Sequence, residues 1–213
     1  MTIEATVDGQ LVRWRDSKRY LWLLGAVIPL IPMAIWGAYA LTEWSAWWWF
    51  GPFFVFVVIP IFDLLAGLDP NNPPDEIIEA LEEDRYYRWI TYAFIPLQLI
   101  GFVWGCYLLG GGTLPGIAEP LSVVDKIGLA TGLGMVAGIG INTAHELGHK
   151  KESLERWAAR IALAQTFYGH FYIEHNRGHH VRVATPPDPA SARLGETVWE
   201  FFPHTVWGSL KSA

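Results

Sequence analysis

Long apolar runs, almost free of charged residues, alternate with short polar breaks along the first two thirds of the chain. The runs lie at about 20–42, 45–67, 89–110 and 126–145. Each is long enough to cross the hydrocarbon core of a bilayer, which takes roughly 20 helical residues. The pattern predicts an all-α membrane protein, with about four transmembrane helices and further amphipathic helices on the cytoplasmic side. We expect residues 1–213 to form a single integral-membrane domain.

The composition supports this prediction. Of the 213 residues 52% are hydrophobic and only 17% are charged, against about 25% charged residues in an average soluble domain. The net charge of −6 provides no basic surface for nucleic acid, so a nucleic-acid partner is excluded. Cys106 is the single cysteine, and one cysteine supports neither a disulfide framework nor a thiolate metal site.

Two local patterns refine the predicted helices. The sequence LDPNNPP at 68–74 predicts a helix start, with Asn72 as the capping residue. The pairs Gly128/Gly132 and Gly134/Gly138 repeat a spacing of small residues that lets membrane helices approach closely. Loose packing in a flexible helix is the alternative for these glycines.

The distribution of lysine and arginine predicts the orientation. Basic residues precede the first run, separate the second from the third and follow the fourth. The other two connections contain no lysine or arginine apart from Lys126. Because cytoplasmic loops are enriched in lysine and arginine, the N-terminus and the residues after the fourth run are predicted to be cytoplasmic.

Five of the seven histidines lie between 145 and 180, in the sequences HELGHK at 145–150 and EHNRGHH at 174–180. Neutral imidazole is the commonest protein ligand for several transition metals. Histidines four residues apart share one face of an α-helix, as His145 and His149 would, and likewise His175 and His179. On such a helix His180 is turned about 100° from its neighbour and could serve a second metal. One histidine alone would be ascribed to packing or to the surface, as we do for His170 and His204, but five favour a metal site.

HELGH also fits the H-E-x-x-H signature of zinc peptidases. In that interpretation His145 and His149 bind zinc, Glu146 is the general base on a zinc-bound water, and Glu174 is a possible third ligand. The interpretation leaves the three histidines of 175–180 unexplained. A non-catalytic membrane protein that binds or stores a metal is a further alternative.

Several longer motifs resemble one family. They are NNPP at 71–74, NTAHELGHKK at 142–151, GHFYIEHNRGHH at 169–180 and VATPPDPASARLGE at 183–196. Together they resemble the membrane-bound alkane 1-monooxygenases, within the larger group of histidine-box fatty-acid desaturases and hydroxylases. A related fatty-acid desaturase or hydroxylase is the alternative within that group.

The resemblance implies terminal hydroxylation of medium-chain to long-chain n-alkanes to 1-alkanols, with O2 and two non-haem iron ions. Electrons would come from NADH through rubredoxin reductase and rubredoxin, at the inner membrane of a bacterium. The implied iron ligands are His145, His149, His175, His179 and His180. Glu146 and Glu174 would hold imidazole N–H groups, and Val55 and Phe56 are candidates for the substrate channel.

The family also has a third histidine box and a further histidine, in a C-terminal portion with two more spans. This sequence does not contain them. We therefore expect an N-terminal part of such an enzyme, which by itself would not hold two irons in a working geometry.

Overall fold

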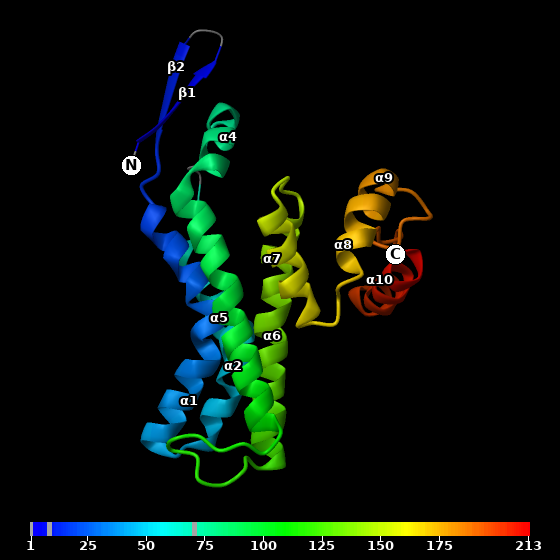
Figure 1. Ribbon diagram of the computed structural model, residues 1–213. Helices are drawn as coiled ribbons and strands as arrows, with labels where there is room; N and C mark the ends of the chain where they lie inside the picture. Colours follow the sequence, from blue (N-terminus) through cyan, green and yellow to red (C-terminus); the bar gives the residue numbers. More distant parts are fainter. Residues whose placement is uncertain (1, 8–9, 70–71) are drawn as a thin grey trace. The chain divides into compact units, whose positions relative to one another are not determined.

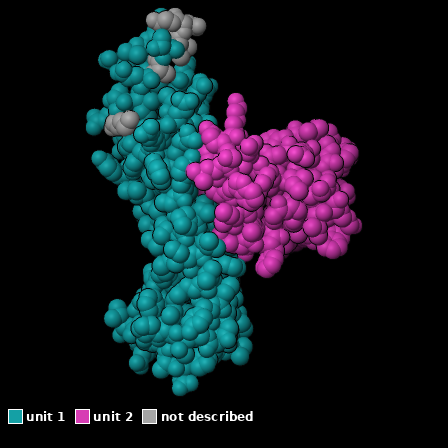
Figure 2. Space-filling model, in the orientation of Figure 1, with its two compact units in different colours: residues 1–137 teal, residues 138–213 magenta. Residues whose placement is uncertain are grey.

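The computed structural model describes residues 2–7, 10–69 and 72–213 and is mostly helical (Figure 1). The predicted fold class is confirmed. Within the described residues four helices are long and apolar enough to cross a membrane, at Arg19–Thr42, Ser45–Ala66, Arg85–Leu109 and Val123–Gly148. The chain divides into two compact units, residues 1–137 and 138–213 (Figure 2). That these units act as one domain remains a prediction.

The first span changes helix type at its prolines. Two 3-10 segments, Arg19–Ala26 and Ile28–Leu30, precede helix α1 at Ile31–Thr42. Pro29 and Pro32 lie at this change. Proline has no backbone N–H, so it removes a hydrogen bond from a regular helical ladder.

The second span also changes helix type along its length. A 3-10 segment at Ser45–Trp49 leads into α2 at Phe50–Phe53, a π-helix at Phe54–Val58 and α3 at Ile59–Ala66. Val55 and Phe56 lie in the π-helix; Val55 is half-buried, whereas Phe56 is 70% exposed. Their role in a substrate channel remains a prediction.

A small polar part is formed by two strands that precede the first span and a helix that precedes the third. Strands β1 (Thr2–Val7) and β2 (Gln10–Arg15) form an antiparallel pair that the sequence analysis did not anticipate, with Ile3 opposite Trp14. Helix α4 runs from Asp75 to Glu83, and its Ile77 is fully buried. The prediction that Asn72 caps this helix is wrong. Pro74 holds the position before the first turn in an extended conformation, and no side chain caps the helix.

Helices α5 (Arg85–Leu109) and α6 (Val123–Gly148) are the third and fourth spans. The close approach predicted for Gly128 and Gly132 is confirmed. A Cβ on Gly51 would lie 2.6 Å from Cα of Gly132, and one on Gly128 would lie 2.8 Å from the carbonyl oxygen of Trp48. The second pair of glycines, by contrast, faces open space. The core of this unit includes Ile31, Ile35, Trp48, Leu108, Ile117, Leu121, Leu129 and Leu133.

The second unit begins within α6 and carries all the histidines. After α6 come α7 (Ser153–Ala164), α8 (Phe171–Ile173), a π-helix at Glu174–His179, α9 (His180–Arg182) and α10 (Val198–Ser212). Thr197 caps α10 in a reciprocal capping box with Glu200, which satisfies backbone N–H groups at the helix start. Helix α10 therefore has a defined beginning after the proline-rich loop that follows α9.

Candidate metal centre

Four imidazole rings lie close together at the C-terminal end of α6, whose last turn carries His145. Nε2 of His149 lies 3.2 Å from Nε2 of His145 and 3.1 Å from Nε2 of His175. Nε2 of His175 lies 3.1 Å from Nε2 of His180. Two nitrogens that each bind one metal ion at about 2.1 Å can be no more than about 4.2 Å apart. All three separations meet this limit, so neighbouring members of this histidine cluster (His145, His149, His175 and His180) can share an ion.

The π-helix determines which histidines of the second group meet. A π-helix is hydrogen-bonded from i to i+5 rather than from i to i+4, so residues five apart come to the same side. His180 is five residues after His175, and their Nε2 atoms are in contact. The α-helical period did not predict this contact between His175 and His180. That His179 and His180 serve two different metals remains a prediction.

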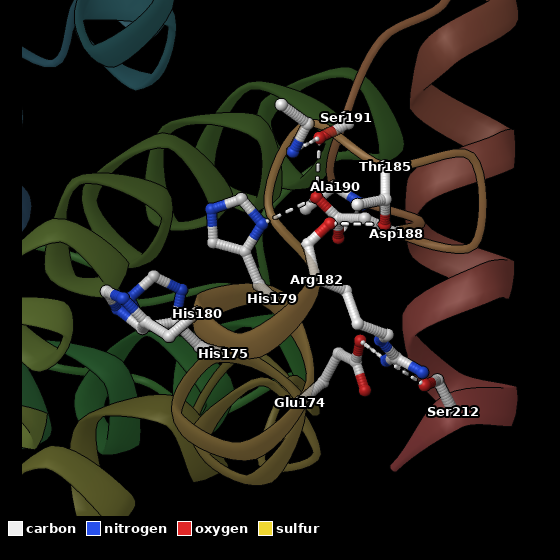
Figure 3. Close-up of polar contacts among 11 residues, drawn as sticks. Glu174, His175, His179, His180, Arg182, Thr185, Asp188, Ala190, Ser191 and Ser212 are labelled. Atoms are coloured by element: carbon white, nitrogen blue, oxygen red, sulfur yellow. Dashed lines mark hydrogen bonds and ion pairs between the residues drawn. The ribbon is translucent and has the colours of Figure 1, made fainter.

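His179 stands beside the cluster in a different orientation. Its ring is stacked on that of His175, with centroids 5.5 Å apart and planes at 20°. Its Nδ1 atom lies 2.9 Å from Oδ2 of Asp188 (Figure 3). All five predicted ligand histidines therefore lie in one region, four with converging Nε2 atoms and one anchored through Nδ1.

The electrostatic environment keeps the central imidazoles neutral. Burial, followed by repulsion from the surrounding histidines when they are protonated, lowers the pKa of His175 to about 4. Burial and repulsion from His145 and His180 likewise lower the pKa of His149. Neutral imidazole is the form that binds metals. The cluster is therefore ready to accept a cation at neutral pH.

Carboxylates fix the orientation of two rings. Oε1 of Glu146 lies 2.9 Å from Nδ1 of His145, the kind of contact that the resemblance implied for this glutamate. An ionised carboxylate can only accept a hydrogen bond. Nδ1 of His145 must therefore donate, and Nε2 keeps its lone pair, as in the carboxylate–histidine pairs that support metal ligands.

Asp188 supports His179 in the same way, and the sequence analysis did not single it out. It is 1% exposed. It accepts hydrogen bonds from Nδ1 of His179, from the Ser191 hydroxyl and from the Ala190 N–H (Figure 3). Burial alone would raise the pKa of Asp188, but the bonds from Ser191, Ala190 and His179 together hold it below its ordinary value. The only sequence signal was its position within the PPDP motif that follows the histidines.

Glu174 has a different role from the one expected. Its buried carboxylate pairs with Arg182, Oε1 to Nη2 at 2.6 Å, and not with an imidazole. Arg182 also donates to the Ser212 hydroxyl at 2.6 Å, which links the histidine-bearing segment to α10 (Figure 3). A Cβ on Gly178 would lie 2.3 Å from the Glu174 carboxylate. Glycine at this position therefore leaves the space that the ion pair occupies.

The other two histidines stay outside the cluster. His170 packs edge-to-face against Tyr168, and its buried Nε2 has no hydrogen-bond partner within the described part of the chain. Nδ1 of His204 lies 3.0 Å from Oε1 of Glu196. The donor set of the site is therefore made of neutral imidazoles with nearby carboxylates. Such a set suits iron, zinc or copper, so the residues present fit a non-haem metal.

Comparison with known proteins places this site in context. The alkane 1-monooxygenase of Acinetobacter baylyi is 44% identical to the chain over 201 residues, 93% of the chain and 48% of that protein. The chain is similar in sequence to alkane 1-monooxygenases. Those of Pseudomonas putida and Alcanivorax borkumensis are 40% and 38% identical, each over 93% of the chain. The profile of the fatty acid desaturase family matches residues 126–213.

These similarities confirm the resemblance inferred from the motifs, and they do not favour the metallopeptidase interpretation. The chain spans about half the length of the alkane 1-monooxygenases it matches, 48% of the first two. The desaturase match begins in α6 and includes the whole histidine cluster, Asp188 and α10. The similarity to the desaturase family therefore extends over the supporting network as well as the histidines.

Proposed function

We propose that this chain serves the terminal hydroxylation of medium-chain to long-chain n-alkanes to 1-alkanols with O2. The observation that carries the proposal is the convergence of four Nε2 atoms in a chain similar in sequence to alkane 1-monooxygenases. Two non-haem iron ions are the proposed metals. Iron, when bound, supplies the redox chemistry for O2.

The proposed iron ligands are His145, His149, His175, His179 and His180. Glu146 and Asp188 hold Nδ1–H of two of these imidazoles, at 2.9 Å in each case. Each ring is thereby fixed in the tautomer whose Nε2 can bind a cation. Phe171 stacks on His175 with ring centroids 4.9 Å apart. This contact restricts the imidazole to one orientation and shields one of its faces from water.

The proposed substrate has no polar group, so apolar burial must bind it. Each buried CH2 contributes about 0.8 kcal/mol, and an eight-carbon chain gains on the order of 6 kcal/mol. The four apolar spans offer such surroundings within the bilayer, where alkanes dissolve. Val55 and Phe56 remain candidates for the channel. The histidines begin in the last turn of the fourth span, at the membrane boundary, which suits a substrate that arrives from the lipid.

The proposed electron source is rubredoxin, reduced by NADH through rubredoxin reductase. The distribution of lysine and arginine supports a position of the histidines on the cytoplasmic side, which we propose is that of a bacterial inner membrane. A soluble electron carrier can reach the site there, whereas the alkane enters from the bilayer. A site at the membrane boundary therefore suits the reaction, because the electron carrier and the alkane reach it from different sides.

The test uses the chain and a hybrid in which the C-terminal half of the Acinetobacter baylyi relative follows it. Membranes with each protein receive octane, O2, NADH, rubredoxin and rubredoxin reductase. We expect the hybrid to form 1-octanol, measured by gas chromatography, and the His179→Ala hybrid to form none while inserting normally. Undiminished 1-octanol formation by that variant would disprove the ligand assignment. One zinc and no iron in both proteins would instead indicate zinc chemistry.

A further inference from the structure

A groove of about 590 Å³ lies between α7 and the helical segment that carries the second histidine group. Two helical segments form its walls. Along each segment the lining residues are spaced about one helical turn apart, as expected where two helices face one another. The lining residues are Ser153, Arg156, Trp157, Arg160, Gly169, Tyr172, Ile173, Asn176 and Arg177. All belong to the second unit, and the histidine cluster does not line the groove.

The charge of the groove is unusual for this chain. Three arginines line it and no acidic residue does, although the chain as a whole has a net charge of −6. Within the described residues Arg156, Arg160 and Arg177 form no ion pair with a carboxylate. Like charges held together disfavour one another unless an anion lies between them. The groove therefore carries positive charge that no neighbouring carboxylate among the described residues balances, and this charge favours the binding of an anion.

Aromatic rings and a hydrogen bond order both walls of the groove. The guanidinium carbon of Arg160 lies 5.1 Å from the ring centroid of Trp157 and 4.7 Å from that of Tyr172. Such stacking holds the guanidinium plane while its N–H edges stay free to donate. Nδ2 of Asn176 donates to the Tyr172 carbonyl at 2.9 Å. The central arginine is thus oriented before a ligand arrives.

The position of the groove indicates where an anion would come from. Ser153 begins the helix that follows the fourth span, and Lys150 and Lys151 lie in the short connection between them. A cluster of basic residues next to a transmembrane helix is typical of sites for anionic lipids. Trp157 is 60% exposed, and tryptophan is enriched at the membrane–water interface. Guanidinium groups bind phosphate oxygens through pairs of parallel hydrogen bonds.

We propose that this groove binds the headgroup phosphate of an anionic phospholipid. The site is separate from alkane hydroxylation and does not depend on it. A bound headgroup would lie between α7 and the segment that carries His175, and its phosphate would offset part of the positive charge of the three arginines. The ligand is therefore a structural lipid that holds the two helices together at the membrane surface.

The experiment measures lipid retention by native mass spectrometry. The detergent-solubilised chain is mixed with phosphatidylglycerol or with phosphatidylcholine of the same acyl chains. We expect phosphatidylglycerol to be retained at least about tenfold more strongly, and Arg156→Gln, Arg160→Gln and Arg177→Gln together to remove that preference. The control carries the same loss of charge outside the groove, at Arg13→Gln, Arg15→Gln and Arg193→Gln. It should keep the preference.

Several outcomes would overturn the proposal. They are equal losses in the groove and control variants, no preference in the unmodified chain, or binding of soluble glycerol phosphate as tight as that of the lipid. If the triple variant does not fold, Arg156→Gln alone decides, because this exposed residue supports no stacking contact. Iron content reports on the histidines independently, so the groove variants should keep it and His175→Ala should keep lipid retention.

Discussion

Replacement of Asp188 by asparagine tests how the site prepares His179. The native carboxylate accepts hydrogen bonds from His179 and Ser191 at Oδ2 and from the Ala190 N–H at Oδ1. Asparagine has one acceptor oxygen and one NH2 group. The side-chain oxygen of the asparagine must stay next to the Ala190 N–H, because a backbone N–H can only donate a hydrogen bond. The NH2 group then faces His179, whose Nδ1 must become an acceptor, and the proton moves to Nε2.

The expected magnitude follows from burial and charge. A hydrogen bond to a charged group contributes about 1.5–3 kcal/mol, so Asp188→Asn should lower the free energy of unfolding by roughly that amount. Loss of a carboxylate that orients a ligand histidine typically lowers metal affinity about 10–100-fold. The pKa of Asp188 is lowered in the folded chain. Its stabilisation is therefore present above the ordinary aspartate pKa and lost as the pH falls through the folded value, so assays at neutral pH measure the whole effect.

The assay has two readouts that do not require turnover. Anaerobic titration with Fe(II) measures affinity, and nitrogen NMR of the metal-free chain identifies the tautomer of His179. Ser191→Ala is the matched control. It removes one hydrogen bond to the Asp188 carboxylate but leaves the charge of that carboxylate and its contact with His179 unchanged. The control should lose stability but keep the tautomer. If Asp188→Asn kept both the Nδ1–H tautomer and Fe(II) affinity within about twofold, the orienting role would be refuted.

Three further predictions use the same chain. His175→Ala should lower Fe(II) affinity at least about tenfold, whereas His204→Ala, outside the cluster, should not change it; equal effects in the titration would contradict the assignment. Gly178→Ala should lower the free energy of unfolding by about 1–3 kcal/mol, because its Cβ would meet the Glu174 carboxylate; Gly169→Ala, which meets nothing within 4 Å, is the control in thermal unfolding. Because the pKa of His175 is lowered to about 4, the unfolded metal-free chain gains a proton at higher pH than the folded chain. Its denaturation midpoint should therefore fall as the pH is lowered from about 6.5 towards 4, and His175→Ala should weaken that dependence.

The spans could be predicted because the bilayer imposes a simple requirement on the sequence. About 20 residues without charge are needed at each crossing, and that signal does not depend on distant contacts. The predicted span at 89–110 begins at Arg85 in the structure, because Asp84 caps the helix by accepting from the Tyr86 N–H at 2.7 Å. The strands at Thr2–Val7 and Gln10–Arg15 were missed, since each has only 6 residues and their pairing with one another is tertiary information.

The candidate site was predictable in composition but not in geometry. The spacing of the histidines predicted that they would gather, and four of them do. An α-helical period did not predict the contact between His175 and His180, because no residue in EHNRGHH distinguishes an i to i+5 ladder from an α-helical one. Asp188 was missed for a related reason. It lies 8 residues beyond His180 in a loop, and only the folded chain brings it to Nδ1 of His179.

The two buried carboxylates, at Glu174 and Asp188, together explain how a short irregular helix can hold ligands in a fixed arrangement. The π-helix that carries His175 and His179 has few regular hydrogen bonds to stabilise it on its own. Glu174 ties its beginning to Arg182, and Arg182 in turn binds Ser212 at the end of α10. Asp188 ties its end to the following loop through His179. The residues after the histidines thus contain no proposed ligand, yet they brace the segment at both ends, and we expect truncation before α10 to weaken metal binding without removing a single histidine of the cluster.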